Sequence, residues 1–243
     1  MKIRVTYKNA ALAVAALVMA AAFGLLVRIY SGDIIATSGM GSNRPVVIID
    51  PGHGGVDGGV DGGAVGVDGT AEKEINLAIS QKLQCLLELG GFEVIMTRET
   101  DVSIHDDSAL TTRQKKVSDL HNRLAMVESH PGAIFISIHQ NKFSVGKYWG
   151  TQVFYGPGHE DSSELAGLIQ RSIVAELQPD NSREIKKAQK NLFILFNAKT
   201  PAVLVECGFL SNAEENKRLG NPDYQDELAF CIYTAILEYY GRV

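Results

Sequence analysis

Four polar side chains in this 243-residue chain have types and positions suited to metal-assisted chemistry: His53, Glu72, His139 and Glu206. Three of them come at or just after the end of an apolar, β-branched run that predicts a buried strand. Glu72 instead stands in the first turn of the helix predicted after the glycine-rich stretch 54–69. Because sites in open α/β sheets form outside the carboxyl ends of the strands, we expect all four side chains at one edge of the sheet.

The donor types indicate which metal would suit this edge. Two imidazoles and one or two carboxylates, without a thiolate, fit a catalytic zinc that has three protein ligands and one open position. Calcium and magnesium prefer mainly oxygen ligands, so they fit less well. The residues are scattered along the chain, unlike the ligands of an H-E-x-x-H helix, so spacing alone does not select the ligands. A single histidine after a strand is commonly structural or exposed, but two at separate strand ends favour a metal site.

The other polar candidates have simpler interpretations. Asp50 precedes Pro51 and is interpreted as a turn former or as a partner of a metal ligand. Trp149 could stack on a sugar ring or pack at a rim. The remaining histidines are interpreted as solvated: His105, His121, His130 and His159. Three lysines are interpreted as a solvated face, although an anionic glycan polymer would also suit them: Lys186, Lys187 and Lys190.

Strands that alternate with helices predict the elements that position these side chains. Periodicity and turn residues predict strands over residues 46–49, 92–97, 133–138, 151–155, 192–196 and 202–205. They predict helices over residues 71–89, 113–129, 162–177 and 223–240. This alternation predicts a single layered α/β domain with a mostly parallel, twisted sheet flanked by helices.

The N-terminus differs from the rest of the chain. Three basic residues precede an uncharged apolar run over residues 10–27, closed by Arg28, which predicts that residues 1–28 are a signal peptide or a membrane anchor. The run has 18 residues, at the short end of what spans a bilayer, so cleavage and retention both stay open. Residues 29–44 are rich in serine and glycine and predict a linker. In either case we expect the following domain to work outside the cytoplasm.

Charge and cysteine content exclude other classes of protein. Residues 45–243 contain 18 basic and 27 acidic residues, a net charge of −9. Nucleic acid requires clustered positive charge, so we expect no nucleic-acid partner, and contact with a membrane only through the N-terminal segment. The cysteines are far apart and form no C-x-x-C, which favours buried thiols over a disulfide framework. They are Cys85, Cys207 and Cys231.

Five blocks of the sequence resemble a known family. They are IIDPGHGG (48–55), EKEINLAI (72–79), MTRETD (96–101), SIHQN (137–141) and VECGFLSN (205–212). In this order they resemble the blocks of the zinc-dependent N-acetylmuramoyl-L-alanine amidases of bacterial cell walls, the amidase type 3 family. The resemblance covers essentially all of residues 45–243. The compact form, the N-terminal segment and RQKKVSDLHNR (113–123) look most like the germination-specific members from spore-forming bacteria.

Carried over position by position, the resemblance implies that His53, Glu72 and His139 bind zinc. It also implies that Glu206, in the V-E-x-G-F block, is the catalytic glutamate. In the family's E-K-x-x-N-L block the ligand is the glutamate before the lysine, so Glu74 is expected to face elsewhere.

Two positions depart from the family pattern. The VDGG unit is written twice over residues 56–63, which lengthens the glycine loop that leads to Glu72. Gln140 stands where the family has a small residue, and its longer side chain is expected to narrow the cleft. Arg183, in a polar loop, is a candidate for binding a stem-peptide carboxylate, and a surface role is its alternative.

The resemblance implies zinc-dependent hydrolysis of the amide between the lactyl group of N-acetylmuramic acid and L-alanine in peptidoglycan. The narrower likeness implies action on spore cortex, on the route to the muramic lactam needed for germination. The implied partners are then peptidoglycan glycan strands and stem peptides, with an activating or regulatory protein as a further candidate. Two alternatives remain: a zinc peptidase that cuts within the stem peptide, and a non-catalytic wall-binding module.

Overall fold

The computed structural model describes residues 44–55 and 63–243. The predicted export segment, nearly all of the predicted linker and most of the duplicated VDGG unit therefore lie outside the described residues. The compact unit of the structure is Pro45–Val243. Within the described part of the chain, no helix combines the length and the apolar character needed to cross a membrane.

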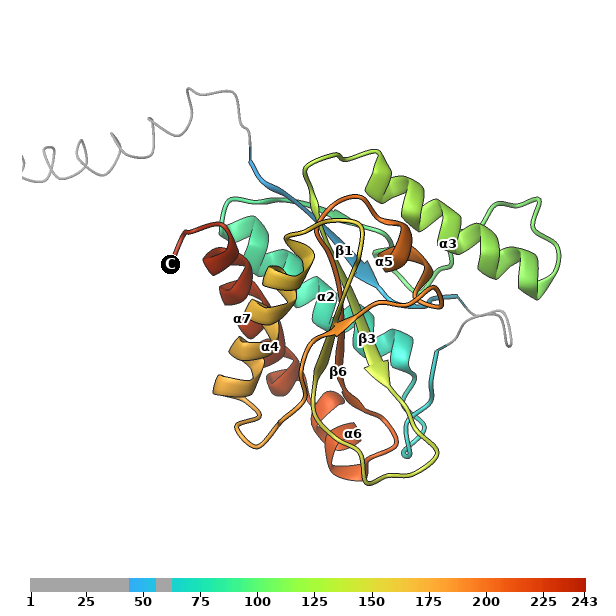
Figure 1. Cartoon of the computed structure of the whole chain (residues 1–243). Coiled ribbons are helices and arrows are strands. Elements are labelled where there is room, and N and C mark those ends of the chain that lie inside the picture. The colour runs from blue at the N-terminus through green and yellow to red at the C-terminus, as the bar shows by residue number, and fades with distance from the viewer. Residues whose placement is uncertain (1–43, 56–62) are drawn as a thin grey trace, which may run out of the picture. The chain divides into compact units, whose positions relative to one another are not determined.

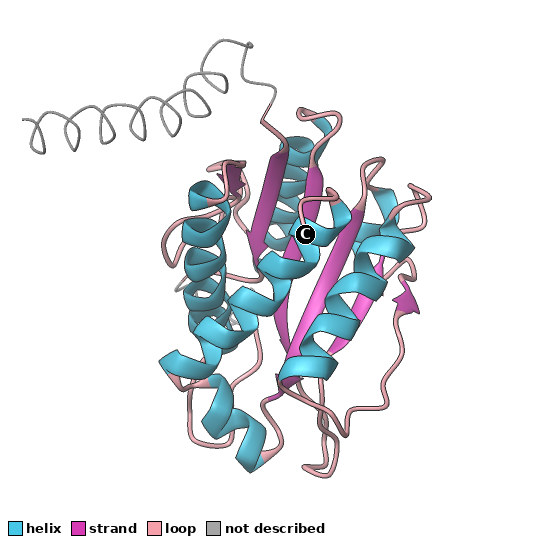
Figure 2. Cartoon of the chain, turned by 90° about the vertical axis from the view of Figure 1, so that its left-hand side faces the viewer, coloured by secondary structure: helices cyan, strands magenta, loops and turns pink. Residues whose placement is uncertain are grey.

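A six-stranded sheet in the order β2-β1-β3-β6-β4-β5 forms the centre of this unit (Figure 2). Its strands are β1 (Val46–Pro51), β2 (Glu93–Met96), β3 (Ile134–Asn141), β4 (Gln152–Tyr155), β5 (Lys186–Lys187) and β6 (Ala202–Phe209). Neighbouring strands are parallel except for β4 and β6, which run antiparallel. The prediction of a single α/β domain with a mostly parallel sheet is confirmed.

Helices cover both faces of the sheet, with α3 and α5 on one face and α2, α4 and α7 on the other (Figure 1). The helices are α2 (Glu72–Leu89), α3 (Thr112–Glu128), α4 (Ser162–Glu176), α5 (Phe193–Asn197), α6 (Ala213–Leu219) and α7 (Pro222–Tyr239). Alternating residues of β1 enter the two layers: Val47 and Ile49 pack with α2, whereas Ile48 packs with α3 and α5. Because both faces are covered, the sequences of the central strands are continuous apolar runs and do not alternate between apolar and polar residues.

Three local predictions were wrong or incomplete. Residues 192–196 do not form a strand but lie almost entirely in the short helix α5, which buries Ile194 and Leu195 against the sheet. A five-residue apolar run is too short to distinguish the two periods, so the sequence could not decide between them. The exposed pair Lys186–Lys187 forms the edge strand β5, and α6 was not predicted.

The cysteine prediction holds for two residues of three. Cys207 and Cys231 are buried, but Cys85 is exposed on α2, and all three are free thiols. The three lysines are exposed, as expected, and so is His121. The other three histidines predicted to be solvated are half-buried: His105, His130 and His159.

A matched pair of leucines on α2 tests which face of this helix carries the core. The Leu83 side chain is fully buried, whereas Leu89 is 82% exposed. We expect Leu83→Ala to lower the free energy of unfolding by about 2–5 kcal/mol through lost burial and a residual cavity. Leu89→Ala should change it by less than about 0.5 kcal/mol. Urea unfolding followed by circular dichroism measures both, and equal losses would contradict this packing.

Candidate metal centre

The carboxyl ends of β1 and β3 and the start of α2 bring three potential ligands together. His53 follows β1, His139 lies near the end of β3, and Glu72 is the first residue of α2. One donor atom from each of the three lies within 4.8 Å of the others. Glu72 Oε1 is 3.2 Å from His53 Nε2 and 3.1 Å from His139 Nδ1. Two nitrogens and one carboxylate that converge in this way fit a metal with an incomplete protein ligand set.

Backbone and side-chain donors hold the Glu72 carboxylate in place. The amide of Ala64 donates to Oε2 at 2.7 Å, and the amide of Gln140 donates to Oε1 at 3.1 Å. Burial alone would raise the pKa of Glu72, but the hydrogen bonds with His139 and His53 outweigh it and leave the pKa well below its ordinary value. Glu72 is thus an ionised carboxylate placed to bind a cation. Glu74, two residues later, is exposed.

The turn after β1 is shaped by close contact with His139. A Cβ atom on Gly52 would overlap the imidazole of His139, so only glycine permits the two segments to approach this closely. His53 itself has φ of +61°, the only positive φ of a non-glycine residue in the described part of the chain. The two imidazoles meet edge to face, with ring centroids 4.8 Å apart.

Glu206 lies beside this cluster on β6. It is opposite His139 in the parallel register of β3 and β6. Its Oε2 is buried without a hydrogen-bond partner among the described residues, although the residue as a whole is half-buried. Burial raises the pKa of Glu206 to about 7, and the negative charge of Glu72 adds to this effect while His139 opposes it. Glu206 is therefore a carboxyl group with a free oxygen at the edge of the ligand cluster.

Gln140 does not narrow the cleft, contrary to the prediction. Successive side chains of β3 point to opposite faces, so the residue after His139 turns toward α2. Its side chain is 3% exposed, and its amide donates to Asn76 Oδ1 at 3.1 Å. The longer side chain at this position therefore binds Asn76 of α2 and does not occupy the cleft.

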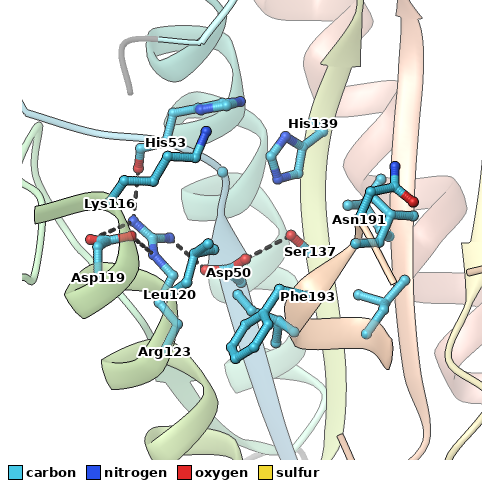
Figure 3. A pocket seen from close by; sticks show the side chains of 15 residues that line it. Asp50, His53, Lys116, Asp119, Leu120, Arg123, Ser137, His139, Asn191 and Phe193 are labelled. Carbon is cyan, nitrogen blue, oxygen red and sulfur yellow. Dashed lines mark hydrogen bonds and ion pairs between the residues drawn. The ribbon is translucent and has the colours of Figure 1, made fainter. Parts of the chain in front are cut away.

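A cavity of about 160 Å³ lies next to the two histidines, between α3 and α5 (Figure 3). One wall is polar and includes Asp50 and Arg123, and the opposite wall is apolar and includes Phe193. The centre of the polar wall is the ion pair between Arg123 Nη1 and Asp50 Oδ1, at 2.6 Å. Asp50, interpreted from the sequence as a turn former or a partner of a metal ligand, thus pairs with Arg123. The role of Arg123 was not predicted, although it is a charge on the inward face of an amphipathic helix.

Arg183 lies on the other side of Glu206. Its guanidinium stacks over the ring of Phe209, 4.6 Å from the centroid. It donates to the carbonyl of Trp149 at 2.7 Å and to Gln152 Oε1 at 3.3 Å. Gln152 pairs with Glu206 across β4 and β6, so Arg183 lies one strand away from the carboxyl group. A second cavity, of about 220 Å³, opens here between Arg183 and Trp149.

A mostly parallel α/β sheet with such a cluster at its carboxyl edge defines a class, that of α/β enzymes with a candidate metal centre. The chain belongs to the amidase type 3 family of N-acetylmuramoyl-L-alanine amidases, whose family model matches residues 47–238. It is therefore a hydrolase of the N-acetylmuramoyl-L-alanine amide bond in peptidoglycan. The family resemblance inferred from the five sequence blocks is confirmed.

Individual relatives agree with this assignment. The chain is 34% identical over 195 residues to the germination-specific N-acetylmuramoyl-L-alanine amidase of Bacillus subtilis, covering 80% of this chain and 79% of that one. It is similar to the CwlD amidase of Clostridioides difficile, solved in complex with the GerS lipoprotein, with TM-score 0.76 and 40% identity over 82% of this chain and 99% of that one. It also resembles the amidase AmiC2 of Nostoc punctiforme, with TM-score 0.69 and 29% identity over 83% and 100% of the two chains.

The buried ion pair behind the site predicts a pH dependence of stability. Burial would raise the pKa of Asp50, but Arg123 and the hydroxyl groups of Ser137 and Thr97 lower it from 3.8 to about 2. Since the pKa is lower in the folded protein, the carboxylate stabilises the fold fully above about pH 4 and loses this effect as the pH falls toward 2. The shift corresponds to roughly 2 kcal/mol.

We therefore expect the free energies of unfolding of the wild type and Asp50→Asn to differ most above pH 4. The difference should shrink by roughly 2 kcal/mol between pH 4 and pH 2. Urea titrations at several pH values provide the measurement. A difference that does not vary with pH would show that Asp50 is not ionised in a stabilising pair.

Proposed function

We propose that this amidase is zinc-dependent, with His53, Glu72 and His139 as the metal ligands and Glu206 as the proton-transfer residue. The observation that carries the proposal is the convergence of three donor atoms within 4.8 Å of one another. Imidazole and carboxylate donors without thiolates suit zinc better than magnesium or calcium. A bound zinc supplies Lewis-acid polarisation of the scissile carbonyl and lowers the pKa of water.

Glu206 supplies the acid–base chemistry in this proposal. It takes a proton from the attacking water and returns it to the nitrogen of L-alanine as the amide bond breaks. Two observations support the role: Glu206 lies opposite His139 across the strand pair, and its Oε2 accepts no hydrogen bond from the described residues. A buried carboxyl oxygen that no described residue satisfies keeps its capacity to accept a proton.

Arg183 is proposed to bind a carboxylate of the stem peptide. Its guanidinium is held by Trp149 and Gln152 and lies one strand from Glu206. Arginine recognises carboxylates through paired N–H donors, and stem peptides carry such groups. The alternative remains that Arg183 only packs over Phe209 at the surface.

The biological setting is proposed from the relatives and from the N-terminal sequence. A relative named as germination-specific supports action on spore cortex peptidoglycan, on the route to muramic lactam. A related amidase solved with a lipoprotein supports an activating protein partner. We propose that residues 1–28 export or anchor the chain, that residues 29–44 are a linker and that residues 45–243 are the catalytic domain, which acts in the cell wall or forespore envelope.

The products of digestion test this function. The proposal predicts peptide-free muramic acid and new L-alanine amino termini when the zinc-loaded protein acts on cortex peptidoglycan, as seen by mass spectrometry of the muropeptides. Shortened stem peptides that stay attached to muramic acid would instead indicate a peptidase. Binding to glycan without any new amino terminus would indicate a non-catalytic wall-binding module.

Substitution of the proposed proton-transfer residue should separate catalysis from metal binding. Glu206→Gln keeps the size of the side chain but removes the group that accepts the proton. We expect it to lower turnover by about 10²–10⁴-fold while the zinc content stays at one per chain. Turnover assays and metal analysis on the same preparation measure the two quantities. Wild-type turnover in Glu206→Gln would remove Glu206 from this role.

The first turn of α2 offers a matched pair for the carboxylate ligand. Glu72 is buried against both histidines, whereas Glu74 is exposed. Both substitutions remove one acidic residue near the helix N-terminus, so their effects on the helix dipole are similar. We expect Glu72→Ala to weaken zinc binding by more than the roughly 10–100-fold that is usual for a residue behind a ligand. Glu74→Ala should leave zinc binding unchanged, as measured by competition with a chelator. The reverse ranking would place the ligand at Glu74.

A further inference from the structure

We infer that Arg123, supported by Arg98, is a positioning residue for His53. Its guanidinium holds the backbone of His53 in the conformation from which the imidazole reaches Glu72 and His139. The inference rests on the proposed function, because it takes His53 to be a metal ligand. It adds that two arginines outside the ligand cluster determine the geometry of that ligand.

The backbone of His53 needs such support. Its φ of +61° is in the left-handed region, which residues with a Cβ atom rarely adopt. Gly54 and Gly55 continue the turn with φ of +135° and +93°, so the segment after β1 has little conformational preference of its own. A conformation of this kind persists only where surrounding groups determine it.

Three successive carbonyl groups of this turn accept hydrogen bonds from buried side chains. The carbonyl of Pro51 accepts from Arg98 Nε at 2.9 Å and from Arg123 Nη1 at 3.0 Å. The carbonyl of Gly52 accepts from Arg98 Nη2 at 3.0 Å. The carbonyl of His53 accepts from Arg123 Nη2 at 2.9 Å. Since a carbonyl that points toward its donor fixes the adjoining peptide planes, these bonds define how the turn leaves β1.

Arg123 is itself rigidly held (Figure 3). It is 2% exposed, and its Nε donates to Asp119 Oδ2 at 2.7 Å within α3. Its Nη1 bonds Asp50 Oδ1, three residues before His53, at 2.6 Å. All three guanidinium nitrogens therefore have partners, and one of these partners is the carbonyl of the proposed ligand. A lysine carries the same charge but lacks this planar fork of donors.

A purely structural role for Arg123 predicts a different outcome from a positioning role. Both predict lower stability when the ion pair with Asp50 is disturbed. Only positioning predicts that a folded variant loses metal affinity. Thr97→Val provides the matched control, because Thr97 donates to the same Asp50 oxygen at 2.7 Å and accepts from Arg123 Nη1 at 3.3 Å, but has no hydrogen bond with the His53 carbonyl.

The experiment measures zinc affinity of the full-length protein by competition with a chromophoric chelator. We expect Arg123→Lys to weaken zinc binding by about 10–100-fold, the usual effect of removing a partner behind a ligand. Thr97→Val should lower Tm but keep zinc affinity within about threefold of the wild type. Wild-type affinity in folded Arg123→Lys would overturn the inference. If Arg123→Lys does not fold, Arg98→Lys takes its place, because it removes donors to the Pro51 and Gly52 carbonyls of the same turn. Wild-type zinc affinity in folded Arg98→Lys would then overturn the claim that the arginines hold this turn.

Hydrogen exchange on the metal-free protein separates this inference from the proposed function. We expect peptides that span residues 50–55 to exchange faster in Arg123→Lys than in Thr97→Val. Equal exchange in the two variants would show that Arg123 does not hold the turn. A wild-type protein that binds no zinc would overturn the proposed function alone, and the exchange comparison would still decide whether the turn is clamped.

Discussion

The buried ion pair between Asp50 and Arg123 is the interaction on which the site depends. It joins the end of β1 to α3 at 2.6 Å, and the same guanidinium reaches the carbonyl of His53. Ser137 on β3 donates to the other oxygen of Asp50 at 2.6 Å, so one carboxylate connects two strands and a helix. Removing one partner from such a buried pair leaves an uncompensated charge, which is strongly destabilising. Fold and site are thus stabilised by the same contacts.

The parallel sheet positions the remaining polar side chains of the site. Parallel strands deliver His139 and Glu206 to the same edge in register, and the glycine at position 52 lets the turn after β1 pack against the His139 ring. α2 then supplies Glu72 from its first turn, where backbone amides of two segments hold the carboxylate. Each polar side chain comes from a different element, which explains why the residues are far apart in the sequence.

The sequence predicted the parts of this arrangement that follow from strand ends. Long apolar runs identified β1, β3 and β6, and the polar residues that follow these runs lie close together, as expected. β3 and β6 nevertheless continue past His139 and Glu206, to Asn141 and Phe209. The short run that became α5 was misassigned because five apolar residues fit either period. Arg98 and Arg123 were missed because the contacts that bury them join residues 47 and 72 positions apart in the sequence. The only local signal was the charge of Arg123 on the inward face of a predicted helix, which does not reveal its partners. The burial of Gln140 against α2 follows from strand alternation, which the family resemblance alone does not predict.

We propose that this edge of the sheet holds zinc through His53, Glu72 and His139. Anomalous diffraction from crystals of the protein, collected on both sides of the zinc absorption edge, tests it most directly. We expect one strong peak about 2.0–2.2 Å from a ring nitrogen of each histidine and from the Glu72 carboxylate, with Glu206 outside the ligand set. A zinc peak held by other residues, or a zinc bound through Glu206 in place of Glu72, would contradict it.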